Sequence, residues 1–163
     1  MKTQARGNSR QPTGHSRSEL LAQLDAAIAR LIATCRAAPD DSRRVAGEWT
    51  LHDVLAHILF WHESFARNVS DLARGRAPTP LEGSYPVLNQ RGVDEAAEFT
   101  VEQLIKRLRA AQRVIARSIV SPLLDRIPYR IGSRDYTPEE HLCIVRDHIL
   151  THVKAIERAS KAR

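Results

Sequence analysis

The stretch Thr50-Leu-His-Asp-Val-Leu-Ala-His-Ile-Leu-Phe-Trp-His-Glu63 begins with a helix start signal. Thr50 and Asp53 have the spacing of a capping box, in which the threonine hydroxyl accepts from a free backbone amide and the acid reaches back to the amide of the capping residue. The pattern continues to about Arg74, and Gly75 follows as a stop signal. We therefore predict one long helix over residues 50–74.

Three further segments have the same helical character. Residues 18–37 place apolar side chains three and four positions apart, which predicts a single buried stripe. A second capping box at Thr100 and Gln103 starts a helix that runs to Ser121. A third start, Thr137-Pro-Glu-Glu140, combines an N-cap, a first-turn proline and a capping acid, and predicts a helix towards residue 160.

Four amphipathic helices without a credible set of strands predict an all-α four-helix bundle. The connection between the second and third helices, residues 75–100, contains several prolines and glycines. A link of this length can cross the whole bundle, so simple up-down-up-down order does not follow from the sequence. Long connections of this kind are often crossovers or functional lids.

Charge and composition predict a compact domain behind a basic tail. The chain has 163 residues and a formal charge of +6. Residues 1–17 contribute four basic residues and no acid, which predicts a disordered tail, and residues 18–163 form the folded domain. Such a tail can bind phosphate weakly and in a salt-dependent way, but without a recognition motif we expect no specific nucleic-acid partner.

The sequence lacks the signals of a membrane or secreted protein. It has no apolar run of about 18 residues, and the basic N-terminus has no apolar signal region. Cys35 and Cys143 do not form a disulfide framework. We expect a cytoplasmic protein with no membrane association.

Two of the seven histidines share one helix face. His148 and His152 are four residues apart, so both can reach one ion. Their face also carries Val145, Ile149 and Ile156, which makes it the buried stripe of the last helix. Buried imidazoles need partners, and a divalent metal ion would satisfy both. Ordinary core histidines with hydrogen-bond partners are the alternative.

A third ligand must come from another helix, and His57 is the candidate because it lies in the interior of the helix over residues 50–74. His62 is turned about 140° from it and should point elsewhere. Asp53 can orient His57 or act only as a cap. His141 shares the His148 face two turns away and can line the mouth of a site. We expect His52, like His15, to be solvated.

The other reactive or aromatic side chains have plainer interpretations. Cys143 is turned away from both last-helix histidines, so packing is its expected role, and Asp147 is interpreted as a surface or supporting acid. Trp61, Phe65 and Tyr85 could line a small-molecule pocket between the helices. Core packing is the alternative role for these aromatic residues.

Several motifs, taken in order, resemble a known superfamily. The block from Gly47 to Glu63, with a Trp before the helix and an acid one turn before a histidine, is similar to the second-helix signature of DinB-like four-helix proteins. The spacing His57…Trp61…Glu63, together with Leu88-Asn89, resembles the ClbS/DfsB-like branch. The ending from Asp147 to Ile156 is similar to the last-helix motif, although Thr151 replaces one histidine of a common doublet.

The resemblance covers residues 18–160 and implies a fold, a site and a function. It implies an up-up-down-down style bundle with a crossover, a homodimer, and a metal triad of His57, His148 and His152 that holds one zinc or nickel ion per chain. It further implies a transferase or hydrolase in stress response or detoxification, with a small-molecule substrate or a low-molecular-weight thiol as partner. The alternative is a metal-free, ClbS/DfsB-like resistance protein that binds or hydrolyses a small molecule.

Overall fold

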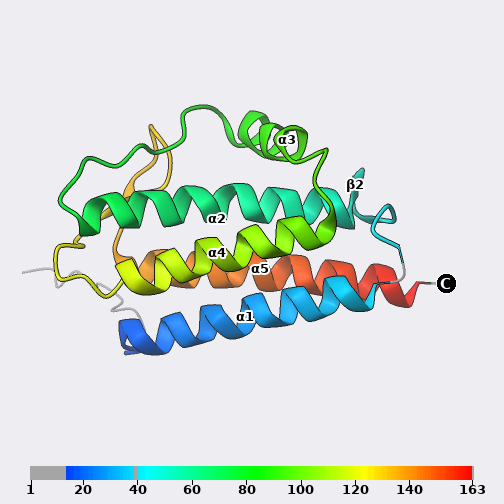
Figure 1. Ribbon diagram of the computed structural model, residues 1–163, viewed down its shortest axis with the longest axis horizontal. Helices are drawn as coiled ribbons and strands as arrows, with labels where there is room; N and C mark the ends of the chain where they lie inside the picture. Colours follow the sequence, from blue (N-terminus) through cyan, green and yellow to red (C-terminus); the bar gives the residue numbers. More distant parts are fainter. Residues whose placement is uncertain (1–13, 39, 163) are drawn as a thin grey trace, which may run out of the picture.

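A computed structural model describes residues 14–38 and 40–162 of the chain. Within them, four long helices lie side by side and a shorter helix lies across one side of the bundle (Figure 1). The all-α bundle predicted from the sequence is confirmed. The helices are α1 (Arg17–Ala37), α2 (Leu51–Ala73), α3 (Tyr85–Glu95), α4 (Val101–Ser118) and α5 (Pro138–Lys161).

The predicted start signals are present as hydrogen-bonded capping boxes. The side chain of Thr50 accepts from the amide of Asp53, and that of Thr100 accepts from the amide of Gln103. At the start of α5, the side chain of Thr137 accepts from the amide of Glu140. The α1 helix starts at Arg17, one residue before the predicted start, because Ser16 caps it. Of the proposed 1–17 tail, residues 1–13 lie outside the described part.

The helices run up, down, down, up along the bundle. Helices α1 and α5 are parallel, since ion pairs join Arg17 to Glu139 near their starts and Arg30 to Glu157 further along. Helices α2 and α4 are also parallel and run the opposite way (Figure 1). The up-up-down-down order implied by the resemblance is therefore wrong. The long crossover brings the chain back to the end where α2 begins, so the next helix repeats the direction of α2.

The crossover contains the helix α3, which the sequence did not predict. It packs against α2, and its buried residues are Leu88 and Gly92. A side chain at position 92 would meet the Cβ and Cγ atoms of Phe60 at 2.7 Å, so only glycine allows α3 to lie this close.

Two short hairpins complete the fold. Strands β1 (Arg44–Ala46) and β2 (Trp49–Thr50) connect α1 to α2, and β3 (Ile127–Pro128) and β4 (Asp135–Tyr136) precede α5. The backbone of Ile131, between β3 and β4, donates to the carbonyl of Leu81 at 2.8 Å and ties this hairpin to the crossover.

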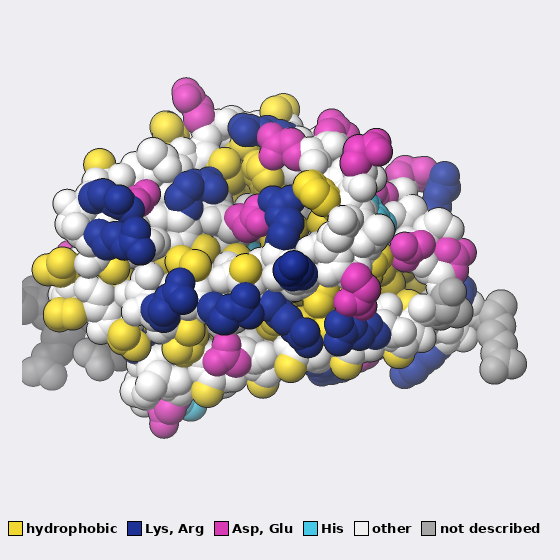
Figure 2. Space-filling view, in the orientation of Figure 1, with side chains coloured by type: hydrophobic (Ala, Val, Ile, Leu, Met, Phe, Trp, Pro, Cys, Tyr) yellow, Lys and Arg dark blue, Asp and Glu magenta, His cyan; other side chains and the backbone are white. Residues whose placement is uncertain are grey.

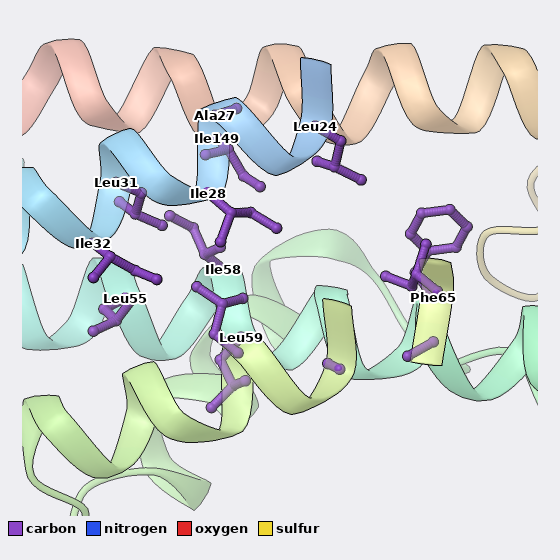
Figure 3. Packing of buried hydrophobic residues seen from close by; sticks show 14 of the residues in the cluster. Leu24, Ala27, Ile28, Leu31, Ile32, Leu55, Ile58, Leu59, Phe65 and Ile149 are labelled. Carbon is purple, nitrogen blue, oxygen red and sulfur yellow. The ribbon is translucent and has the colours of Figure 1, made fainter. Parts of the chain in front are cut away.

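The core is aliphatic and involves all four long helices. Leu24, Ile28 and Leu31 of α1 lie against Ile149 of α5 and the stripe of α2 that includes Ile58 (Figure 3). Each fully buried side chain of this size contributes about 1.5–3 kcal/mol of transfer free energy. This core fixes the relative positions of α2 and α5, which carry the candidate site.

The surface carries mixed charges. Figure 2 shows basic side chains across one face with acidic side chains among them. Several arginines are paired across helices, for example Arg36 with Glu102 and Arg107 with Glu63. None of the described helices combines the length and apolar character needed to span a membrane.

Candidate metal centre

Three histidines from two helices meet between α2 and α5. The Nε2 atom of His148 lies 3.0 Å from the Nε2 atom of His57 and 3.0 Å from that of His152. All three ligand atoms lie within 4.8 Å of one another. His57 is 5% exposed and the other two are partly buried. The structure thus brings together the three residues predicted from the sequence.

Hydrogen bonding alone does not account for this arrangement. A neutral imidazole nitrogen carries either one hydrogen or one lone pair, so His148 Nε2 can form one well-directed hydrogen bond but not two. Nitrogen atoms bound to a single tetrahedral zinc ion at about 2.0–2.1 Å lie roughly 3.3–3.4 Å apart. The two separations are 3.0 Å, so a small outward movement of the rings would bring them to this spacing. One cation could accept a lone pair from each of the three rings.

Burial keeps the three rings in the form that binds metals. It lowers the pKa of His57 to about 3, with further lowering from the neighbouring His148 and His152. Burial, and then His148, lowers the pKa of His152 to about 4, and burial alone lowers the pKa of His148. All three imidazoles are therefore neutral near pH 7, which leaves their lone pairs available.

The surroundings of His57 decide between the two roles predicted for Asp53. Asp53 does not orient the His57 ring: its carboxylate accepts from the backbone amide of Thr50 at 3.0 Å and serves as a cap. The Nδ1 atom of His57 is buried and has no hydrogen-bond partner among the described residues. The indole of Trp49, from β2, lies 5.0 Å from the imidazole, centroid to centroid, and restricts the ring instead.

His141 and His62 lie in the interior, on the same two helices as the triad. His141 is 2% exposed, so its predicted place at the mouth of the site is wrong. It packs edge-on against Phe65, with ring centroids 3.9 Å apart. His62 does point away from His57, as predicted, and contacts Gln112 of α4 at 2.8 Å through its Nε2 atom.

A small cavity with mostly apolar walls lies between these interior residues and the triad. It has a volume of about 10 Å³, and its walls include His62, Ser64, His141 and His148. Trp61 and Phe65, two of the three aromatic residues proposed from the sequence to line a pocket between the helices, do line this cavity, but its histidines and Ser64 were not predicted. A signal was available at Gln112, a polar residue on the buried stripe of α4 between Leu108 and Ile115.

Aromatic residues cover the outer side of this cavity. Trp61 stacks on Tyr129 at 5.0 Å, and its indole N–H donates to the Asn89 side chain at 2.8 Å. Phe65 is a core residue, whereas Tyr85 is 42% exposed beside Trp61. Burial raises the pKa of Tyr129 to about 12, so its hydroxyl stays protonated.

The remaining candidate residues have structural or surface roles. His15 is exposed, as predicted. His52 is not solvated: its Nε2 atom contacts the carbonyl of Phe99 at 2.7 Å, because the segment before α4 packs on the start of α2. Cys143 packs against the core, and Asp147 is an exposed acid paired with Arg146.

One family model matches part of the chain. Residues 45–120 match the family described as the mycothiol maleylpyruvate isomerase N-terminal domain. The match extends from β1 to just beyond α4 and agrees with the DinB-like resemblance at the superfamily level. It does not extend to α5, which carries two of the three histidines.

Two solved structures share the fold. One is the crystal structure of the mycothiol-dependent maleylpyruvate isomerase, with a TM-score of 0.70 and 12% identity. The alignment covers 87% of the present chain but only 61% of that chain. The other is a structural-genomics protein from Streptococcus pneumoniae, with a TM-score of 0.69, 17% identity, and coverage of 91% and 92%. No curated protein matches the sequence.

Proposed function

We propose that the protein is a metal-dependent enzyme that uses a low-molecular-weight thiol to act on a small electrophilic molecule. The observation that carries the proposal is the convergence of three neutral imidazole nitrogens, with two contacts of 3.0 Å, at one point between α2 and α5. Three protein ligands on a divalent ion leave coordination positions open, as in catalytic rather than structural sites.

Some residues of the chain bind the ion in such a site, and others position the residues that bind it. His57, His148 and His152 bind one zinc or nickel ion, and Trp49 limits rotation of the His57 ring. The aliphatic core holds α2 and α5 in register. When bound, the ion lowers the pKa of a coordinated thiol or water and polarises a substrate carbonyl. The described residues next to the triad include no carboxylate that could act as a further ligand.

The thiol partner is inferred from the comparisons. The matched family and one similar structure are named for mycothiol-dependent maleylpyruvate isomerase. A thiol is a soft ligand that suits zinc, and zinc binding favours the reactive thiolate form. Homodimer formation, cytoplasmic location and a role in stress response or detoxification belong to this proposal through the superfamily resemblance alone.

An assay of the metal-loaded chain tests this function. Zinc- or nickel-loaded protein is incubated with mycothiol or bacillithiol and a panel of electrophilic small molecules, and loss of free thiol and formation of product are followed. We expect turnover that disappears in His57→Ala and on chelation, but not in His15→Ala. Turnover that survives both treatments would overturn the metal-dependent function, and so would loaded protein that turns over none of the panel.

A second candidate function has its own supporting observation. In the ClbS/DfsB-like interpretation, Trp61 and Asn89 belong to one signature, and their side chains form a hydrogen bond of 2.8 Å. Together with Tyr129 and Tyr85 they form an aromatic surface that could hold a small molecule without metal. Equal binding or hydrolysis of such a compound with and without chelator would favour this function.

A further inference from the structure

The cavity between α2 and α5 has mostly apolar walls, among them Ile58, Phe65 and Ile149, but it also contains hydrogen-bonding groups that the protein leaves unsatisfied. His62, Ser64 and His141 line it and are 1%, 2% and 2% exposed. Within the described residues, His62 Nδ1, Ser64 Oγ and both ring nitrogens of His141 have no hydrogen-bond partner. Leaving a buried polar atom unpaired costs about 1–3 kcal/mol.

A surface residue, Asp25, determines which ring nitrogen of His62 carries the hydrogen. The exposed Asp25 carboxylate of α1 accepts from Gln112 Nε2 at 2.5 Å. This bond orients the Gln112 amide, because the reversed amide would place its oxygen against a carboxylate. Gln112 Oε1 then faces His62 Nε2 at 2.8 Å, so Nε2 must carry the hydrogen. His62 Nδ1 therefore holds a lone pair and can only accept.

Both histidines are neutral near pH 7. Burial lowers the pKa of His62 to about 4 and that of His141 to about 3. His141 consequently has one N–H that can donate, and Ser64 has one O–H. The cavity thus offers a fixed acceptor on α2, His62 Nδ1, and a donor on α5, the N–H of His141.

The volume determines what can bind there. About 10 Å³ corresponds to room for roughly one water molecule and for nothing larger. Polar cavities of this size that have two to four hydrogen-bonding partners hold ordered water.

We propose that this cavity is a binding site for a single ordered water molecule, which donates to His62 Nδ1 and accepts from His141. The two hydrogen bonds that link Asp25 to Gln112 and Gln112 to His62 leave His62 Nδ1 as the acceptor. His148 lines the same cavity, so the water lies on the inner side of the candidate metal centre. The water site does not depend on a bound metal.

Histidine side-chain NMR on the full-length, metal-free chain at pH 7 tests the orientation of His62. We expect ¹⁵N shifts and couplings of a single tautomer with hydrogen on Nε2. Asp25→Asn frees the Gln112 amide to reverse, and should convert His62 to a mixture of tautomers. Asp94→Asn is the matched control, because Asp94 accepts from Gln90 at 2.8 Å on the exposed face of α3. A wild-type His62 with hydrogen on Nδ1, or an unchanged tautomer in Asp25→Asn, would overturn the proposed hydrogen-bond chain.

A high-resolution crystal structure of the metal-free chain tests the water itself. We expect density for one water within hydrogen-bond distance of His62 Nδ1 and His141. A cavity without density, or one filled by a rotated side chain, would overturn the water site. Neither experiment uses catalytic turnover or metal, so each can fail while the proposed function stands.

Discussion

Two groups of histidines lie on the same pair of helices and have opposite surroundings. In the triad, His57 of α2 meets His148 and His152 of α5, with nitrogens at 3.0 Å. One to two turns further along the bundle, His62 of α2 and His141 of α5 face a cavity and make no direct contact with that triad. Converging lone pairs suit a cation, whereas separated donors and acceptors suit a water molecule.

The difference shows that burial alone does not define a metal site. Burial lowers the pKa of His57, His62 and His141 alike, so all three are neutral bases. What separates them is the direction of the lone pairs. The Gln112 amide already occupies one nitrogen of His62, whereas the Nε2 atom of His57 is directed at the other two imidazoles.

The largest expected effect is on metal affinity. His148→Ala removes the nitrogen that contacts both other ligands. Losing a residue that only orients a ligand typically lowers metal affinity 10- to 100-fold, so we expect the loss of a ligand itself to lower zinc affinity at least about 100-fold. Calorimetric zinc titration measures it. His15→Ala is the control, since this exposed histidine is remote from the triad in the fold and should change the affinity less than twofold. An equal loss of zinc affinity in both variants would show that the triad is not the zinc site.

Bound metal should also stabilise the fold. Zinc at 100 times its dissociation constant raises the free energy of unfolding by about 2.7 kcal/mol if it binds only the folded chain. Urea denaturation with and without zinc measures this gain. Under the same conditions His148→Ala, with an affinity at least about 100-fold lower, should gain no more than about 0.4 kcal/mol; an equal gain there would place the zinc elsewhere.

The interior pair should make the metal-free protein sensitive to acid. The folded-state pKa values of His62 and His141 lie below the unfolded value of about 6.5, so below pH 6.5 the unfolded chain binds protons that the folded chain excludes. Stability is therefore complete above that pH and falls as the pH drops towards 4, by about 1.4 kcal/mol per pH unit for each such histidine.

His141→Leu separates the interior pair from the triad in this titration. In urea denaturation between pH 7 and 5, with chelator present, the variant should lose about 1.9 kcal/mol less stability than the wild type, which is one histidine's share over this range. His15→Leu should leave this loss of stability unchanged. If His141→Leu also left it unchanged, the interior histidine would not be held neutral by the fold.

The smallest effect concerns the start of α5, which lies nearer to His141 than to the triad. Thr137→Ala removes the capping hydroxyl and should lower the free energy of unfolding by about 1 kcal/mol. Amide exchange should accelerate around His141 more than around His148 and His152. Thr151→Ala on the same helix is exposed and should cost much less. Equal acceleration at both ends would mean that α5 unfolds as one unit.

Local signals made most of the fold predictable. The threonine caps at positions 50, 100 and 137 mark helix starts through contacts three residues apart, which a sequence displays directly. Helix α3 was not predicted because its apolar pattern is weak and its burial depends on a tertiary contact, the packing of Gly92 on Phe60. The helix directions also depend on where the crossover ends, which spacing within the sequence does not show.

The candidate site was predictable to the extent that it follows helix periodicity. His148 and His152 share a face by their four-residue spacing, and the family resemblance supplied the match for His57. The environment of His62 was not predictable, because Gln112 and Asp25 lie 50 and 87 residues from their partners along the chain. Only the packing of α4 against α2, and of α1 against α4, brings them together.

The proposed metal centre requires that the three Nε2 atoms hold one ion. A crystal structure of the full chain loaded with zinc, with anomalous diffraction recorded at the zinc absorption edge, tests it directly. We predict one strong peak per chain between His57, His148 and His152, at about 2.0–2.1 Å from each Nε2 atom. An anomalous map without a peak there, or with zinc bound only elsewhere, would contradict the account.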